Sequence, residues 1–156
     1  MTGHLQKEIR QEKPFASLEQ EVVLNIMRTA ASLRQSTGEV LRPWDLSGPQ
    51  YNILRILRGA GEDGLPCSDI AERLVSRDPD VTRLLDRLEK RGLAVRGRWS
   101  ADRRVVTARI TKEGLELADR LDAPIARKHK EQLGHMKKKH LKALIGLLEA
   151  ARGEED

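Results

Sequence analysis

Two arginines four residues apart are the first candidates for chemistry in this sequence. The segment "VTRLLDRLEK" places Arg83 and Arg87 on one side of a predicted helix. Like charges at this spacing destabilise an isolated helix by roughly 0.2–0.5 kcal/mol, so the pair needs a reason to be there. Guanidinium groups bind phosphate oxygens and base edges through paired hydrogen bonds, which would supply one. The alternative is a solvated charged face, in which Asp86 and Lys90 also lie four residues apart and could pair with each other. The helix alone does not decide between these two interpretations.

A second basic pair lies at the tip of a predicted hairpin. In "RWSADRRVVTARI" two alternating segments flank a polar turn that contains Asp102, Arg103 and Arg104. The turn arginines gain nothing from packing, but a narrow DNA minor groove attracts them, and Asp102 would hold one guanidinium in place. A turn that only aids solubility is the alternative. Inward-facing positions are predicted at Leu93, Val95, Trp99, Val106, Ala108 and Ile110, and outward-facing ones at Arg96, Arg98, Val105, Thr107 and Arg109.

Two short helices precede the hairpin and form a helix-turn-helix candidate. The second is expected to begin with Asp78 as N-cap and Pro79 in its first turn, with Asp80 complementing the positive helix end, and to stop at Gly92. A second helix in the major groove would leave the hairpin to reach the backbone or the adjacent minor groove, which favours the functional interpretation of both arginine pairs. The predicted core positions are Ile70, Ala71 and Leu74 on the first helix, and Val81, Leu84, Leu85 and Leu88 on the second.

Amphipathic helices flank this core on both sides. Ser17 and Gln20 predict a capping box, Ser47 predicts a second start, and Thr111 predicts the N-cap of a long helix over 112–132 that Pro124 would bend. A last helix is predicted through "HLKALIGLLEAA". The apolar stripes are Leu18, Val22, Ile26, Ala30 and Leu33; Tyr51, Leu54 and Leu57; Leu115, Ala118, Leu121 and Ile125; and Leu141, Leu144, Ile145 and Leu148.

Composition limits the class of protein. The chain has 156 residues, which suits one domain, and 29 Lys plus Arg against 24 Asp plus Glu give a net charge of +5 that permits an anionic partner. The single cysteine, Cys67, excludes an intramolecular disulfide and suits a cytoplasmic protein. No segment has the length and hydrophobicity of a membrane span or a signal peptide. Polar residues 1–14 predict a flexible arm, and 152–156 an acidic tail.

Three motifs together resemble the winged helix-turn-helix core of the MarR family of transcriptional regulators. They are "SDIAERL", "VTRLLDRLEKRGL" and "DRRVV" followed by "IT" and Gly114. The resemblance implies a mainly α fold with a small β-hairpin wing, in one domain over 15–151. Its winged helix-turn-helix core would span about 46–111, between dimerisation helices at about 15–42 and 112–151. It also implies a homodimer that binds a pseudo-palindromic operator in double-stranded DNA, as a repressor that a small molecule or an oxidant releases.

The resemblance assigns roles to particular residues. It implies a recognition helix over 79–91 and a wing over 99–105, in which Asp102 braces Arg103 or Arg104. A small-molecule pocket would be lined by Met27, Trp44 and Tyr51, which otherwise belong to the core. The expected DNA contacts are Ser76, Arg77, Thr82, Arg83, Arg87, Asp102, Arg103 and Arg104.

Other functions find less support. Cys67 lies at a predicted helix start, where the helix dipole favours the thiolate. The chain has no second cysteine with which Cys67 could form a disulfide, and it lacks the first-helix cysteine that the resemblance implies for a peroxide sensor. We therefore expect no redox role. His4, His129, His135 and His140 lack metal-site spacing, and no catalytic motif indicates an enzyme, so neither metal nor cofactor is expected. The main rival is a winged-helix module for protein interaction or non-specific DNA binding. Steep salt dependence with a large sequence preference would exclude that rival.

Overall fold

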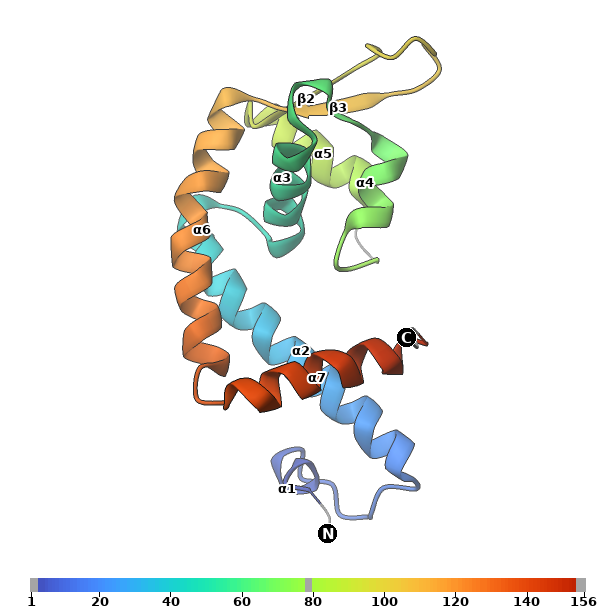
Figure 1. Cartoon of the computed structure of the whole chain (residues 1–156), viewed down its shortest axis with the longest axis vertical. Helices are drawn as coiled ribbons and strands as arrows, with labels where there is room; N and C mark the ends of the chain where they lie inside the picture. The colour runs from blue at the N-terminus through green and yellow to red at the C-terminus, as the bar shows by residue number, and fades with distance from the viewer. Residues whose placement is uncertain (1–2, 78–79, 154–156) are drawn as a thin grey trace. The chain divides into compact units, whose positions relative to one another are not determined.

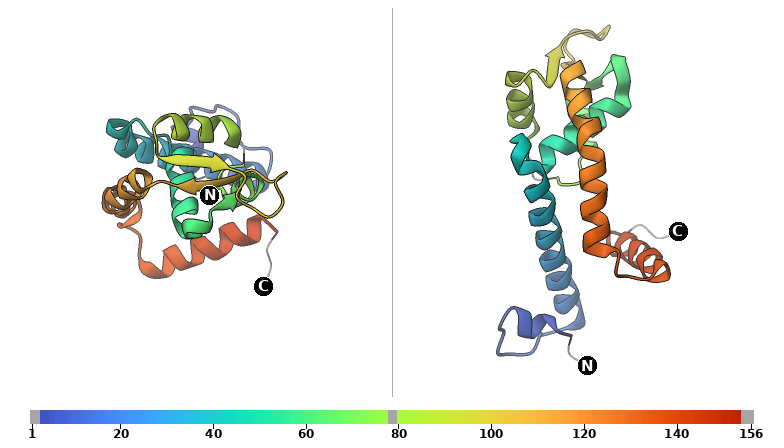
Figure 2. Two further views of the ribbon diagram at one scale, coloured as in Figure 1. Left: turned by 90° about the horizontal axis from the view of Figure 1, so that it is seen from above. Right: turned by 90° about the vertical axis from the view of Figure 1, so that its left-hand side faces the viewer.

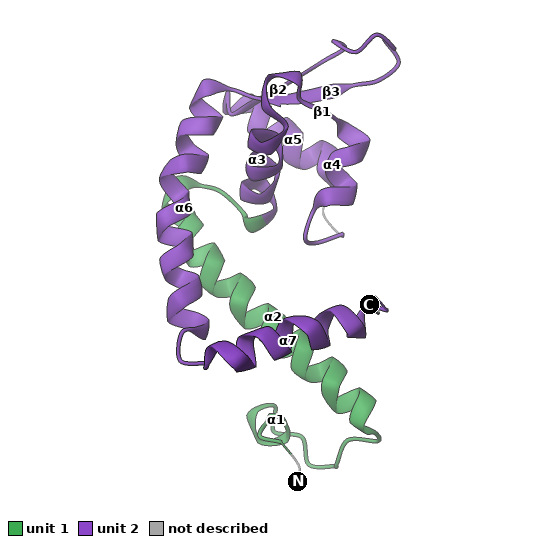
Figure 3. Ribbon diagram, in the orientation of Figure 1, with its two compact units in different colours: residues 1–48 green, residues 49–156 purple. Residues whose placement is uncertain are grey.

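The computed structural model describes residues 3–77 and 80–153, and it is mainly helical with one small antiparallel sheet. This confirms the predicted fold class. The chain divides into two compact units, residues 1–48 and residues 49–156 (Figure 3). No helix in the described ranges is long and apolar enough to cross a membrane.

The first unit consists of α1 (Leu5–Glu8), α2 (Leu18–Leu41) and the 3-10 helix η1 (Arg42–Trp44). The predicted cap of α2 is confirmed, because the Ser17 hydroxyl accepts a hydrogen bond from the Gln20 amide at 3.1 Å. The Gln20 side chain in turn accepts from the Ala16 amide at 2.6 Å, one residue earlier than in a standard capping box. The short helix α1 lies inside the segment 1–14, whose predicted flexibility stays a prediction.

The apolar stripe of α2 is largely uncovered in the single chain. Leu18 is 77% exposed, Val22 51% and Ile26 38%. A helix that leaves an apolar stripe in water gains little from it, so such a face is normally covered by a partner surface.

The second unit holds the helix-turn-helix and the sheet (Figure 1). Its strands β1 (Leu65–Pro66), β2 (Ala94–Gly97) and β3 (Thr107–Ile110) pair in the order β1-β3-β2, all antiparallel. Its helices are α3 (Gly48–Ala60), η2 (Gly61–Asp63), α4 (Cys67–Arg73), α5 (Val81–Lys90), α6 (Lys112–Leu133) and α7 (Lys138–Ala151). The fully buried side chains that join these elements are Ile53, Leu54, Leu57, Ile70, Leu85, Leu88 and Leu121.

Helix α5 begins later than the sequence suggested. Its N-cap is Asp80, whose carboxylate accepts a hydrogen bond from the Arg83 amide at 3.2 Å, so the prediction of Asp78 as N-cap is wrong. Asp78 and Pro79 themselves lie outside the described residues. Both aspartates are good capping residues, and the one adjacent to Val81 satisfies the free amide of the first turn directly.

The predicted alternation of the hairpin is wrong in part. Val95 is 39% exposed and Trp99 44%, whereas Ala94 is buried and Arg96 is half-buried. The face shared by Ala94 and Arg96 is occupied because Arg96 binds two carboxylates of α5. In the central strand β3, adjacent residues Thr107 and Ala108 are both buried, since this strand has a neighbour on each side.

One smaller prediction on α4 also fails. Ile70 and Leu74 are buried as expected, but Ala71 is exposed. A seven-residue helix has slightly less than two turns, which is too few to define the edge of its apolar face.

The start of α6 is fixed by its predicted cap. The Thr111 hydroxyl accepts from the Gly114 amide at 3.0 Å and donates to the Gly92 carbonyl at 2.6 Å. The Thr111 amide also donates to the Leu93 carbonyl at 3.2 Å, so the end of β3 is joined to the turn after α5. Pro124 lies inside α6 without ending it.

A substitution at Gly114 tests the packing of this junction, because helix propensity favours a side chain there and the contact with Leu93 opposes one. A Cβ at Gly114 would overlap the Leu93 carbonyl oxygen and approach Ile110 Cγ1 to 2.9 Å. Helix propensity alone predicts that Gly114→Ala stabilises the protein by about 1 kcal/mol. We expect instead a loss of roughly 1–3 kcal/mol, as for an overpacked core, in urea unfolding at fixed protein concentration.

Gly59→Ala is the matched control for Gly114→Ala. Gly59 is also helical, in α3, and no heavy atom lies within 4 Å of its added Cβ. This variant should gain about 0.5–1 kcal/mol. Equal effects of the two substitutions would contradict the packing described for the α6 start.

Candidate nucleic-acid interface

Helix α5 has one buried face and one charged outer face. Leu85 and Leu88 are buried as predicted, while Val81 and Leu84 are half-buried. The predicted contact residues of this helix, Thr82, Arg83 and Arg87, are all exposed. The helix therefore presents two guanidinium groups outward while its leucines fix it to the core.

The connection into α5 carries two more predicted contact residues. Ser76 is half-buried and Arg77 is exposed, in the segment that follows α4. The Val75 amide donates to the Asn52 side-chain oxygen at 3.0 Å, which ties this segment to α3. Ser76 and Arg77 thus follow an anchored backbone position on the way to the recognition helix.

The sequence analysis missed an ion-pair cluster that joins α5 to β2. Arg96 donates through Nε to Glu89 Oε2 at 2.7 Å, and its Nη2 also binds the Asp86 carboxylate. The hydrogen bonds that Arg96 donates to Glu89 and Asp86 raise the pKa of Arg96 further above its ordinary value. Asp86 therefore pairs across to the strand, and no ion pair with Lys90 forms among the described residues. An arginine in a strand that follows a helix with two carboxylates three residues apart was the available signal.

The wing arginine that Asp102 holds is Arg104. The two carboxylate oxygens of Asp102 accept from Arg104 Nε and Nη2, both at 3.1 Å, and Oδ1 also accepts from the Arg104 amide at 3.0 Å. These bonds lower the pKa of Asp102, so it is ionised at neutral pH. The Arg104 side chain is still 91% exposed, so the pairing orients the guanidinium without withdrawing it from solvent.

Two further contacts at the base of the wing were not predicted. Arg98 Nη1 donates to the Arg103 carbonyl at 2.7 Å across the loop. The Arg109 guanidinium lies over the Trp99 ring, 4.1 Å from its centroid, in a cation–π contact. The loop is thereby held at its base and at its tip, and the Arg103 side chain is exposed.

Helix and wing are joined through strand β2. Helix α5 packs against β2, and the wing loop extends from the ends of β2 and β3 away from the helices (Figure 1). We define the reading surface as the exposed or half-exposed residues Ser76, Arg77, Thr82, Arg83, Arg87, Asp102, Arg103 and Arg104.

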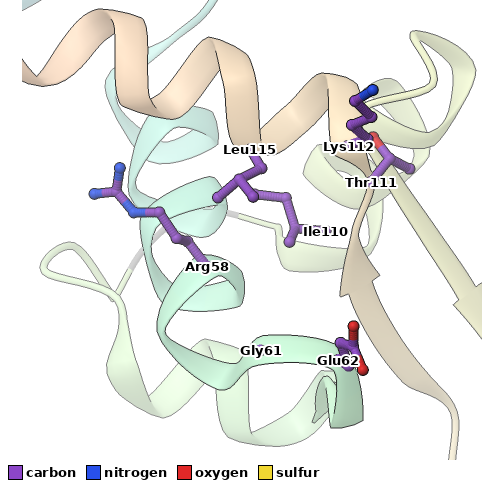
Figure 4. Close-up of a pocket in the computed structure, with 7 residues that line it drawn as sticks. All are labelled: Arg58, Gly61, Glu62, Ile110, Thr111, Lys112 and Leu115. Carbon is purple, nitrogen blue, oxygen red and sulfur yellow. The ribbon is translucent and has the colours of Figure 1, made fainter.

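The predicted ligand-pocket residues have different environments. Met27 is 61% exposed on α2, Trp44 is half-buried in η1, and Tyr51 is only 6% exposed in α3. None of them lines the shallow pocket of about 230 Å³ that lies where α3, η2, β3 and α6 meet (Figure 4). That pocket is lined by Arg58, Gly61, Glu62, Ile110, Thr111, Lys112 and Leu115.

Tyr51 anchors a polar network between α3 and α6. Its hydroxyl donates to Asp122 Oδ1 at 2.7 Å, and burial, followed by this bond, raises the pKa of Tyr51 to about 12. Arg58 Nη1 donates to Asp122 Oδ2 at 2.8 Å and to Asp119 Oδ1 at 2.7 Å. The hydrogen bonds from Arg58 lower the pKa of Asp122. The network holds the long helix α6 to the helix-turn-helix.

Cys67 and the histidines do not form a chemical site. Burial raises the pKa of the Cys67 thiol, which works against the thiolate that a redox sensor needs, although nearby Arg96 opposes the shift. Within residues 3–77 and 80–153, no three His, Cys, Asp or Glu side chains are grouped closely enough to hold a metal ion.

Fold and site together define a winged helix-turn-helix domain, and the comparisons with known proteins agree. The model of the MarR family matches residues 44–105. The chain is 29% identical over 145 residues to the HTH-type transcriptional regulator PecS of Dickeya dadantii, covering 90% of this chain and 87% of PecS. It is 40% identical to a MarR transcription factor from Planctomyces limnophilus whose crystal structure is known, covering 88% of this chain and 99% of that one, with a TM-score of 0.66.

This chain therefore belongs to the MarR family of DNA-binding transcriptional regulators. A crystal structure of a mutant MarR from E. coli complexed with operator DNA has the same fold, with a TM-score of 0.76 at 21% identity over 87% of this chain and 99% of that one. These relatives are named as regulators of transcription rather than as enzymes.

The Arg58–Asp122–Tyr51 network predicts a pH signature at each end of the stability profile. Because the pKa of Asp122 is lowered in the folded state, its contribution is complete above its unfolded pKa of about 3.9 and is lost as pH falls through the folded value. Asp122→Asn should therefore cost about 1 kcal/mol at pH 7, limited by the partial exposure of the pair. The difference from wild type should shrink as pH falls below about 3.9 and vanish once Asp122 is protonated in the folded state.

Tyr51→Phe is the control, because it moves the opposite end of the profile. Because the pKa of Tyr51 is raised in the folded state, folding favours its protonated form. The contribution to stability is complete below the unfolded pKa of about 10 and is lost as pH rises through about 12. Urea unfolding of both variants across the pH range checks the two windows. A constant difference for Asp122→Asn at all pH values would contradict the role given to its charge.

Proposed function

We propose that this chain is a homodimeric repressor that binds a pseudo-palindromic operator through the reading surface. The observation that carries the proposal is the contrast between arginines that carboxylates tie to the fold and arginines whose guanidinium groups are exposed. Arg96 and Arg58 are tied to carboxylates, whereas Arg83 and Arg87 are exposed on α5, and Arg104 is oriented by Asp102 yet 91% exposed. Exposed guanidinium groups on a fixed helix and a fixed loop are suited to a phosphate-rich partner outside the protein.

The two arginine clusters suit different parts of a duplex. A recognition helix of ten residues has the dimensions to enter the major groove, where Arg83 and Arg87 could reach guanine edges or phosphates. The wing tip is narrow and basic, as required for the minor groove, where Arg104 would meet the focused negative potential. Because Asp102 already orders Arg104, less side-chain freedom would be lost on binding.

Two apolar helix faces support a dimer. In addition to the uncovered stripe of α2, helix α7 leaves Leu144, Ile145 and Leu147 between 36% and 69% exposed. Exposed leucines and isoleucines at helical spacing are suited to burial against a second copy. Two-fold symmetry would then repeat the reading surface and require an inverted repeat in the DNA.

The regulatory direction of the proposal is repression by occupancy, with release by a small molecule. It rests on the family's usual mode of action, and the pocket residues Met27, Trp44 and Tyr51 remain a prediction. The polar network around Tyr51 supports such release, because it fixes α6 to the helix-turn-helix. A molecule that disturbed this network would change the spacing of the two reading surfaces in a dimer.

Selection of randomised duplexes by the purified protein, near physiological salt, tests the proposal. We expect enrichment of an inverted repeat whose half-site centres lie about 10 base pairs apart. Enrichment of an asymmetric site would contradict the dimeric mode. No enrichment by a folded protein would favour the rival, a module for protein interaction or non-specific DNA binding.

Arg104→Ala separates a DNA-contacting wing from a structural one. We expect operator affinity to fall by about 1–3 kcal/mol, because a minor-groove cation is lost, while the free energy of unfolding changes by less than about 0.5 kcal/mol. Asp102→Asn should weaken binding in the same direction although it removes a negative charge. Titration of labelled operator duplex measures both effects.

The control for charge is Arg152→Ala, which removes one cation from an exposed position outside the reading surface. It should leave operator affinity within about twofold of wild type, since one remote charge contributes little at physiological salt. A parallel loss of thermal stability in Arg104→Ala would assign the wing tip a structural role.

A further inference from the structure

The strongest concentration of positive charge in the chain lies outside the reading surface. Residues 126–142 contain seven Lys or Arg and one Glu, a net charge of +6, whereas the chain as a whole carries +5. The predicted winged core, 46–111, carries thirteen Lys or Arg and nine Asp or Glu, a net +4 over a segment almost four times longer. We name the seven cations the basic corner: Arg127, Lys128, Lys130, Lys137, Lys138, Lys139 and Lys142.

The basic corner lies where α6 ends and α7 begins. This junction is at the end of α6 opposite the sheet and the wing (Figures 1 and 2). Helix α6 has 22 residues, so at ~1.5 Å per residue the corner is ~33 Å along the helix from Thr111. A duplex seated on α5 and the wing would not reach it without bending far around the protein.

These cations are exposed and mostly free of carboxylate partners. Six of the seven are exposed and Lys128 is half-buried. Among the described residues, the ion pairs of the basic corner comprise the single contact from Lys128 Nζ to Glu131 Oε2 at 3.0 Å. In the single chain the remaining charges repel one another and are available to an outside anion.

Helix stability does not explain the three consecutive lysines. Helix α7 has Lys137 as its N-cap, no side-chain hydrogen bond at the cap and no acidic residue in its first turn. By contrast α2, α5 and α6 start with Ser17, Asp80 and Thr111, each of which caps an amide. Cations at a helix N-terminus oppose the helix dipole, so Lys137–Lys139 are placed against the stability of their own helix. An anionic partner of the surface would offset this.

Nucleic acid fits the basic corner better than a lipid surface does. Membrane-binding amphipathic segments pair basic residues with Trp, Phe or Leu that enter the bilayer. Residues 126–142 contain no Trp or Phe, and the exposed Leu144, Ile145 and Leu147 further along α7 are assigned to the proposed dimer. Lysine is a strongly hydrated point charge that contacts phosphates without reading sequence. The reading surface would in addition keep the protein on DNA, which raises the local concentration of further phosphate backbone.

We infer that the basic corner is a second, sequence-independent DNA-binding surface, which contacts a DNA segment other than the one on the reading surface. The inference rests on the proposed DNA-binding function and extends it. A protein with both surfaces holds two segments of duplex at opposite ends of α6, and so bridges or wraps DNA around an occupied operator.

The test starts from a variant in which the reading surface is disabled, Arg83→Ala with Arg87→Ala and Arg104→Ala. Its residual binding to a random duplex of about 30 base pairs is measured between about 50 and 200 mM salt. We expect binding to persist at low salt with a negative slope of log K against log salt. Adding Lys137→Gln, Lys138→Gln, Lys139→Gln and Lys142→Gln should reduce that slope by about 3 for each corner that contacts the duplex.

A control with the same loss of charge keeps the test specific. Lys7→Gln, Lys13→Gln, Lys112→Gln and Arg152→Gln remove four exposed cations outside the corner and the reading surface, and should change the slope by less than about 1. The four substitutions in the corner should not lower the melting temperature, since they relieve repulsion at the start of α7. Lost DNA binding is then not lost folding.

Each other outcome points elsewhere. Equal slope losses in the corner and control variants, or no residual binding once the reading surface is disabled, would overturn the inference. Binding of the wild type to vesicles of phosphatidylserine and phosphatidylcholine, with an unchanged DNA slope in the corner variant, would replace DNA by a lipid surface. Failure of the proposed function is distinct: the reading-surface variant would then bind DNA as tightly as the wild type, while the corner variant still lost its slope.

Discussion

The arrangement of the reading surface depends on one interaction, the pairing of Arg96 with Asp86 and Glu89. It joins β2 to α5, and β2 continues into the wing, so the recognition helix and the wing share one frame. The same guanidinium offsets one of the two negative charges of Asp86 and Glu89, which would otherwise weaken the attraction of phosphate to Arg83 and Arg87 more strongly. An apolar residue at position 96 could fill the space but could not remove that negative charge.

Arginine has two different uses in this fold: some arginines join elements of the protein, and others, such as Arg83 and Arg87, face solvent on the reading surface. Arg58 spans α3 and α6 through Asp119 and Asp122, and Arg109 lies over Trp99 at the base of the wing. These residues hold elements together, and their charge is used within the protein. Arg104 is intermediate, since Asp102 orders its guanidinium but leaves it 91% exposed. An exposed ion pair of this kind adds little to the free energy of unfolding. Its effect is to hold the Arg104 guanidinium in a defined direction before a partner binds.

The sequence predicted the features that depend on neighbouring residues. The caps at Ser17 and Thr111, the buried face of Leu85 and Leu88, and the contact between Asp102 and one of its two neighbouring arginines follow from local spacing, and all are present. The errors in the hairpin depend on contacts distant in sequence. The inward position of Arg96 follows from the carboxylates of α5, and the burial of Thr107 follows from β1, a strand too short to have a sequence period. The choice of Asp80 over Asp78 is a choice between two equally good local signals.

The charge distribution explains why net charge alone was a weak guide to function. A total of +5 is modest for a nucleic-acid-binding protein, but it is the sum of a basic winged core, a basic corner and two acidic segments. Residues 112–125 carry two cations and four carboxylates, so the first half of α6 is negative between two positive regions. Charges more than about 8 Å apart are largely screened at physiological ionic strength, so a polyanion responds to each region and not to their sum. The acidic half of α6, which includes Asp119 and Asp122, therefore separates two surfaces that could each attract DNA on their own.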